Sequence, residues 1–143
     1  MGLFTGLFSS TVPEPLSVTK EVVFLSGGGN YKLELVGEAR YQNALETICG
    51  PRVPQGVNRF ETALLILEDR NVHDKNAVRV EFRRKPVGYL SREAAILIRQ
   101  QLKAKGMPNA DGQCPAVIKG GWISSDGRKG TYDVWLDIPI SIQ

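Results

Sequence analysis

The sequence predicts a mainly β domain with two helices, folded as a small barrel or a strongly curled sheet. Three observations lead to this class. About six short segments have the character of strands, and two others carry the signals that start and stop helices. A chain of 143 residues is long enough for one hydrophobic core and short for two. We therefore expect a single domain of mixed but mainly β structure.

The chain is expected to begin with a flexible arm of residues 1–30, ahead of a domain at residues 31–143. The arm holds a short apolar group followed by a stretch rich in Ser, Thr and Pro, a composition typical of loosely ordered termini. Gly27-Gly28-Gly29 is expected to be a flexible hinge. It does not predict a phosphate-binding loop, because no Lys-Ser or Lys-Thr pair follows it.

The strands are predicted from alternating polarity and from β-branched residues. The clearest is segment 78–83, where Val78, Val80 and Phe82 share one face and charged residues share the other. Segment 86–90 follows closely and indicates the return strand of a hairpin. The remaining strands are expected at residues 32–35, 60–67, 116–118 and 132–138. For segment 60–67 a helix is the alternative to a strand, because the segment is apolar along its length.

Two helices are predicted between these strands. The shorter covers Ala44 to Ile48, with Asn43 as its cap and a Gly-Pro pair to end it. The longer runs from Arg92 to about Lys105, with Ser91 in the capping position. Its apolar residues form one stripe, which we expect to cover one end of the sheet.

The formal net charge is +3 and the isoelectric point is near 9.0, which permits an anionic partner without requiring one. Basic residues gather in one stretch, and such a cluster either neutralises phosphates or forms an ordinary solvated surface. Charge alone favours the solvated surface. The members are Arg79, Arg83, Arg84, Lys85, Arg92, Arg99, Lys103 and Lys105.

Catalytic and metal chemistry are not expected. The two cysteines and the single histidine, His73, cannot complete a four-ligand zinc site without carboxylates, and no cofactor motif is present. His73 is also the only histidine base for a serine or cysteine nucleophile. Apolar runs fall far below the length of a membrane span, and the lack of a signal peptide predicts a cytoplasmic protein.

The most informative segment is the polar turn from Asn71 to Asn76, and it has two interpretations. Short polar side chains favour turns because they bond neighbouring backbone amides, so the turn could serve only its own structure. The same turn also presents a planar ring, His73, beside a carboxylate, Asp74, that can accept a hydrogen bond from a sugar hydroxyl. Composition does not decide between these interpretations.

Three runs in this order resemble the HIRAN domain, and the match covers roughly residues 32–138. The runs are Val36–Tyr41, Asn71–Val80 and Val87–Arg92, and Gly120-Gly121-Trp122 resembles bacterial members of the family. The resemblance implies an OB-like, six-stranded small β-barrel with two helices. It also implies capture of the 3′ end of single-stranded DNA, the role of this domain in eukaryotic fork-remodelling helicases.

The resemblance assigns expected roles residue by residue. His73 matches a ring that stacks on the terminal base, and Asp74 matches a carboxylate that reads the free 3′ hydroxyl. Arg40 and Tyr41 match an element that grips bases and phosphate. The backbone-contacting positions are Tyr89 and Arg92. The chain departs from the eukaryotic pattern, which has arginine followed by two aromatics where this sequence has Ala39-Arg40-Tyr41, and tyrosine at the position of His73.

The resulting hypothesis is a non-catalytic DNA-binding module that recognises single-stranded DNA at its 3′-hydroxyl end, consistent with a role in DNA repair. A helicase or nuclease on another chain is the expected additional partner. The alternative is a protein–protein interaction module that uses the barrel and the arm of residues 1–30. A metal-dependent hydrolase or nuclease is the third hypothesis, in which replacing His73 or Asp74 would abolish turnover.

Overall fold

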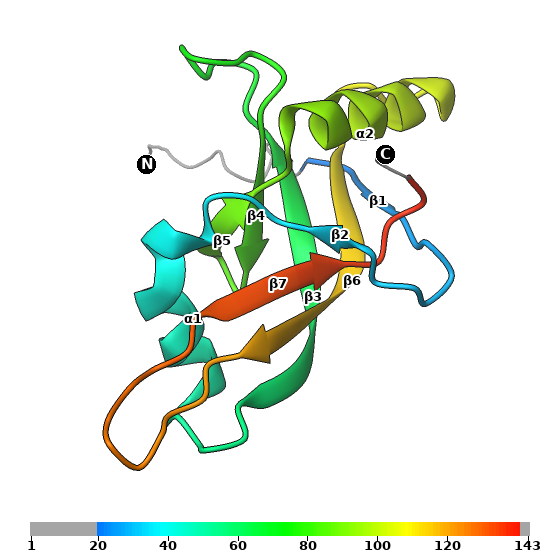
Figure 1. The fold of residues 1–143 in the computed structure, drawn as a ribbon. Coiled ribbons are helices and arrows are strands. Elements are labelled where there is room, and N and C mark those ends of the chain that lie inside the picture. Colours follow the sequence, from blue (N-terminus) through cyan, green and yellow to red (C-terminus); the bar gives the residue numbers. More distant parts are fainter. Residues whose placement is uncertain (1–19, 141–143) are drawn as a thin grey trace, which may run out of the picture.

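The computed structural model describes residues 20–140 and shows one curled sheet with two α-helices (Figure 1). The sheet has seven strands. The strands are β1 (Val22–Phe24), β2 (Leu33–Glu34), β3 (Val57–Leu67), β4 (Val78–Phe82), β5 (Lys85–Tyr89), β6 (Asp111–Gly120) and β7 (Tyr132–Leu136). The helices are α1 (Gln42–Cys49) and α2 (Arg92–Ala104), with a 3-10 helix, η2 (Glu38–Tyr41), leading into α1. The expected class, mainly β with two helices, is confirmed.

The sheet curls into a half-barrel. Its strand order is β2-β7-β6-β3-β4-β5, all antiparallel, and β1 adds a parallel pairing to β6. The two edge segments meet at one point beyond β2, where the amides of Val36 and Tyr89 each donate to the other's carbonyl at 2.9 Å. Because β5 leads directly into α2, this contact places η2, β5 and the start of α2 together.

The core lies inside the curl and follows the alternation seen in the sequence. Val78, Val80 and Phe82 of β4 are fully buried, as their shared face predicted. On β3 the inward positions are Ala63, Leu65 and Leu67, so the segment is a strand and the helix alternative is excluded. Buried residues of α2 cover one end of this core: Ala94, Ala95, Ile98 and Leu102.

The sheet includes β1, a strand that lies within the arm expected at residues 1–30. Val22 to Phe24 align with Asp111 to Gln113 of β6, and the next residue, Leu25, is buried in the core. The arm assignment of residues 1–30 therefore fails from residue 22 onward, and residues 1–19 lie outside the described part. A three-residue strand paired with a partner about 90 positions away leaves little local signal.

The triple glycine is an ordered loop and not a hinge. Asp137, just beyond β7, is buried, and its carboxylate accepts hydrogen bonds from the amides of Gly29 at 2.9 Å and Asn30 at 3.1 Å. Gly28 and Gly29 adopt positive φ values of 87° and 94°, which glycine reaches at no steric cost. The glycines thus fold the chain around a carboxylate of the protein itself.

Both predicted helices exist, and one predicted cap is wrong. Ser91 caps α2 by accepting a hydrogen bond from the Ala94 amide at 3.2 Å, as expected. Asn43 lies inside α1, whose N-cap position is Tyr41. The reason is that η2 runs directly into α1, so the helical chain begins before Asn43. Within residues 20–140, no helix is long and apolar enough to cross a membrane.

Candidate nucleic-acid interface

The loop between β3 and β4, residues 68–77, carries His73 and Asp74 and is shaped by its own polar side chains. The side-chain oxygen of Asn71 accepts from the amides of His73 at 2.8 Å and Asp74 at 3.0 Å. Asp74 Oδ1 accepts from the amide of Asn76 at 2.8 Å. These bonds are those of a self-stabilised polar turn. They use the His73 backbone and leave its ring exposed to solvent.

Two arginines of α2 approach this β3–β4 loop in different ways. Arg99 donates to the carbonyls of Asn76 at 2.9 Å and Ala77 at 3.1 Å, and pairs with Asp69 at 2.7 Å. Arg92 Nε lies 4.0 Å from Asp74 Oδ2, and the Arg92 side chain is 82% exposed. Arg99 therefore fixes the loop on the helix, whereas Arg92 has a guanidinium open to a ligand.

Glu68 at the start of the loop is the centre of a hydrogen-bonded network. Tyr89 donates its hydroxyl to both Glu68 oxygens at 3.1 Å, and Asn71 Nδ2 donates to Glu68 Oε1 at 2.9 Å. Arg79 pairs with Glu68 and also with Glu81. The Tyr89 hydroxyl is thus already bonded to a carboxylate, a setting that disfavours its expected contact with a DNA phosphate.

The pKa values of this network follow from its bonds. Partial burial acts to raise the pKa of Glu68, but hydrogen bonds from Asn71, Arg79 and Tyr89 outweigh it, and the net pKa lies below the ordinary value. Burial raises the pKa of Tyr89, and the Glu68 carboxylate raises it further.

The expected site residues fall into two groups. Asp74 and Arg92 come together at the β3–β4 loop beside His73, whereas Tyr41 belongs to η2, which packs against β5, the strand of Tyr89. The groups are linked through Tyr89, Glu68 and Asn71. Within residues 20–140 no direct hydrogen bond or ion pair joins the two groups. Arg40 is exposed at the surface of η2.

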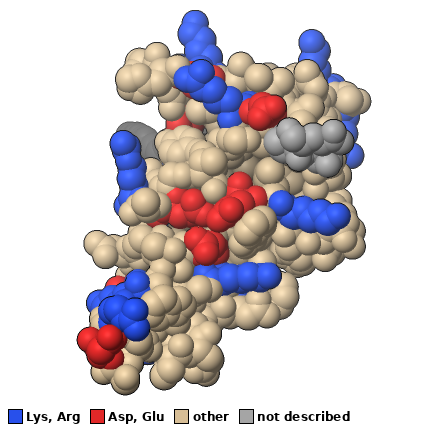
Figure 2. Space-filling view, viewed as in Figure 1, with Lys and Arg blue, Asp and Glu red and all other residues tan. Residues whose placement is uncertain are grey.

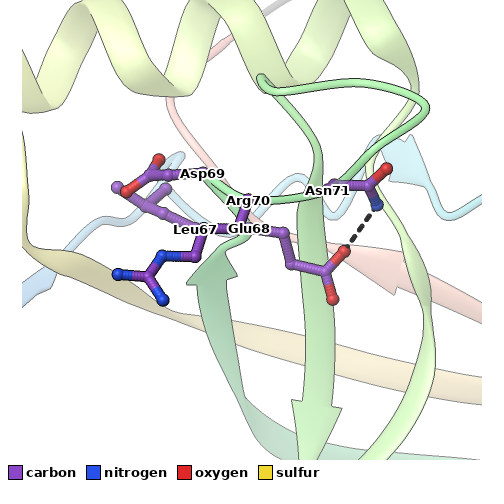
Figure 3. Close-up of a pocket in the computed structure, with 5 residues that line it drawn as sticks. All are labelled: Leu67, Glu68, Asp69, Arg70 and Asn71. Atoms are coloured by element: carbon purple, nitrogen blue, oxygen red, sulfur yellow. Dashed lines mark hydrogen bonds between the residues drawn. The ribbon is translucent and has the colours of Figure 1, made fainter.

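An open pocket of about 490 Å³ lies at the stem of the β3–β4 loop, and it is not among the sites expected from the sequence. Its lining residues are Leu67, Glu68, Asp69, Arg70 and Asn71. Figure 3 shows Arg70 and Asp69 extending to one side of the chain, while Glu68 and Asn71 point to the other. Arg70 is exposed and pairs with no acid among residues 20–140. The one feature of the sequence that could have indicated this pocket is the polar run that begins where the buried strand β3 ends.

The basic stretch found in the sequence does not form one basic surface. Arg79 is paired with Glu68 and Glu81, and Arg83 pairs with Glu61 at 2.9 Å. In Figure 2 the cationic side chains on the face shown are dispersed and do not gather in one patch. The acids that pair with these arginines lie mainly on β3 and the loop that follows it. The sequence of the basic stretch alone therefore could not predict the ion pairs. The ion pairs of Arg79 and Arg83 leave fewer free cations in this stretch for a nucleic-acid phosphate.

A cluster of acids lies where β2, η2 and β7 come together. The carboxylates of Glu34, Glu38 and Asp133 offer oxygens within 4.8 Å of one another, and Figure 2 shows acidic side chains gathered at the centre of the face shown. Burial raises the pKa of Glu34 and Glu38, and like charges add to the rise. The cluster could not be predicted from the sequence, because β7 is about 100 residues from β2. Its charge disfavours a DNA backbone on this face.

The Glu68 network gives a pH-dependent prediction. Replacing Glu68→Gln removes charged hydrogen bonds and should lower the free energy of unfolding at pH 7 by about 1.5 kcal/mol. A lowered folded-state pKa stabilises the protein above the unfolded value, and this contribution is lost as the pH falls below about 4.5. Urea unfolding of both proteins between pH 3 and 7 should therefore give curves that converge in acid. A difference in the free energy of unfolding that does not change with pH would contradict the role of the Glu68 network. Glu21→Gln, an exposed acid, is the control.

The fold and the loop define a β-rich domain with a candidate ligand-binding loop at one end of a curled sheet. No protein-family model, curated protein or solved structure matches the chain.

Proposed function

We propose that this chain is a HIRAN-like, non-catalytic module that binds single-stranded DNA at its 3′-hydroxyl end, on the β3–β4 loop. One observation carries the proposal: Asp74 Oδ2 faces Arg92 at 4.0 Å, beyond hydrogen-bonding distance, while Oδ1 is satisfied by the Asn76 amide. Oδ2 is therefore free to accept a hydrogen bond from a hydroxyl donor. A carboxylate in this position would repel a 3′-phosphate.

The neighbours of Asp74 fit the chemistry of a chain end. The exposed ring of His73 offers a surface on which the terminal base stacks. Arg92 is the first residue of α2, where the positive end of the helix favours an anion, so its guanidinium is placed for the last phosphate. Arg70 at the loop stem is a further exposed arginine of the β3–β4 loop.

The sheet also supports an OB-like small barrel, the fold that the resemblance implies. Val36 and Tyr89 bridge the two edge segments, and they belong to two of the three runs that resemble the family, Val36–Tyr41 and Val87–Arg92. The third run supplies the loop that Tyr89 reaches through Glu68. Residues that resemble one family in sequence are thus neighbours in space. In this proposal a helicase or nuclease on another chain provides any catalysis.

Arg92→Ala tests the proposed phosphate contact. The substitution should weaken binding of a 3′-hydroxyl oligonucleotide severalfold and lower the slope of log affinity against log salt by about 0.7, the value for one contact on a single strand. Fluorescence anisotropy titrations at several salt concentrations measure both quantities.

Lys119→Ala is the matched control, because Lys119 is an exposed cation on β6 that lies opposite Asp133 of β7. It should leave affinity and salt slope close to those of the unmodified protein. Equal losses in the two variants would show that binding follows total charge, and would remove the assigned site.

A further inference from the structure

The outer face of the sheet carries exposed aromatic side chains from three segments. Phe24 of β1 and Phe60 of β3 are each 61% exposed, and Tyr31 lies edge-on to Phe60 with ring centroids 5.5 Å apart. They surround an open pocket of about 550 Å³, which Thr62 and Pro115 help to line. We call this set the aromatic patch. Exposed apolar groups that gather around one hollow indicate a binding surface more strongly than scattered ones.

The aromatic patch is held in place by the fold. Phe60 and Thr62 point outward because they alternate with inward residues along β3. Tyr31 has a φ of 49°, in the left-handed region that non-glycine residues rarely adopt. Its position follows from the loop that wraps around the buried carboxylate of Asp137. The ring of Tyr31 therefore stands beside Phe60 without a ligand to place it.

The charge of the patch favours an uncharged, apolar occupant. Its one charged lining residue is Glu61, which is already paired with Arg59 and Arg83, each at 2.9 Å. The lining therefore offers no cation for a phosphate backbone, although aromatic rings alone could stack on bases. A nucleic-acid strand is for that reason the weaker fit.

The chain itself contains a segment of matching chemistry. Residues 1–13 have no charged side chain and include the apolar group Leu3, Phe4, Leu7 and Phe8. The segment enters the described structure at Lys20, which bonds Asp111 at 3.0 Å. Pro115 lies four residues further along β6, about 13 Å away. Residues 9–19 span up to about 36 Å, so the apolar group can reach the patch.

We propose that the apolar group at residues 3–8 docks on the aromatic patch of its own chain. Attachment through a short linker gives an effective concentration in the millimolar range, so a modest contact suffices. Covering Phe24 and Phe60 removes apolar surface from water and stabilises the docked arrangement.

Nuclear Overhauser effects in the full chain test the contact directly. We expect cross-peaks between the rings of Phe4 or Phe8 and those of Tyr31 or Phe60, with intensities independent of protein concentration. Cross-peaks that grow with concentration, together with a sedimenting dimer, would assign the patch to a second copy and overturn the proposal. Absence of any such cross-peak would overturn it as well.

A coupled set of variants gives a second test. Phe4→Ser combined with Phe8→Ser should uncover the patch and raise the fluorescence of a bound hydrophobic dye severalfold. The same pair should produce no rise in a Phe60→Ala background. It should produce the full rise in an Ile96→Ala background, because Ile96 is exposed on α2 and does not line the pocket of the aromatic patch. Equal rises in both backgrounds would contradict docking at Phe60.

Discussion

Asp137→Ala should lower the free energy of unfolding by about 2 kcal/mol, since it removes the charged acceptor to which the amides of Gly29 and Asn30 donate. Asp137 is only 3% exposed and holds the loop of Gly29 and Asn30 against the end of β7. Ser26 donates its hydroxyl to the same carboxylate at 3.3 Å. Chemical denaturation at pH 7 measures the loss. Asp137→Asn keeps one acceptor oxygen and should cost less.

Asp133→Ala is the control for this substitution. Asp133 lies on β7 near Asp137, but its carboxylate is in the acidic cluster with Glu34 and Glu38. Removing it relieves repulsion between like charges, so stability should be unchanged or slightly higher. If Asp137→Ala costs no more than Asp133→Ala, the amide loop does not depend on its carboxylate.

His73→Ala should reduce the affinity for a 3′-hydroxyl single strand about tenfold or more. The reason is the loss of one stacking platform, which is worth about 1–3 kcal/mol per base. The substitution should not affect stability, because the His73 ring is exposed and only the His73 backbone amide forms a hydrogen bond within the loop. Anisotropy titrations should show the loss, and thermal unfolding should show almost none.

Val72→Ala is the matched control, because Val72 is the adjacent loop residue and is 91% exposed. It should bind DNA as the unmodified protein does. His73→Phe should retain most of the affinity, since a larger ring also stacks. A loss in Val72→Ala equal to that in His73→Ala would assign the effect to the loop as a whole.

The sequence predicted the fold class where local patterns were strong. The alternation of Val78, Val80 and Phe82 located β4, and Ser91 located the start of α2, because each signal is made by neighbouring residues. The parallel strand β1 and the meeting of Val36 with Tyr89 could not be predicted locally, since both depend on partners distant in sequence.

The sequence predicted the polar turn of the candidate site. It did not predict the contacts that this turn makes with other elements. Asn71 and Asp74 bond the loop as short polar residues do in turns. The hydrogen bonds from Tyr89 to Glu68 and from Arg99 to the carbonyl of Ala77 depend on how β5 and α2 pack beside the loop. The acidic cluster on β2 and β7 likewise appears only once the sheet has formed.

We propose that the β3–β4 loop recognises a free 3′ hydroxyl through Asp74. The most direct test is a competition titration of one oligonucleotide with a 3′ hydroxyl against the same oligonucleotide with a 3′ phosphate, at one fixed salt concentration. We predict that the hydroxyl form binds about tenfold more tightly, and that Asp74→Asn removes most of this difference. Equal affinity of the unmodified protein for the two ends would contradict the claim.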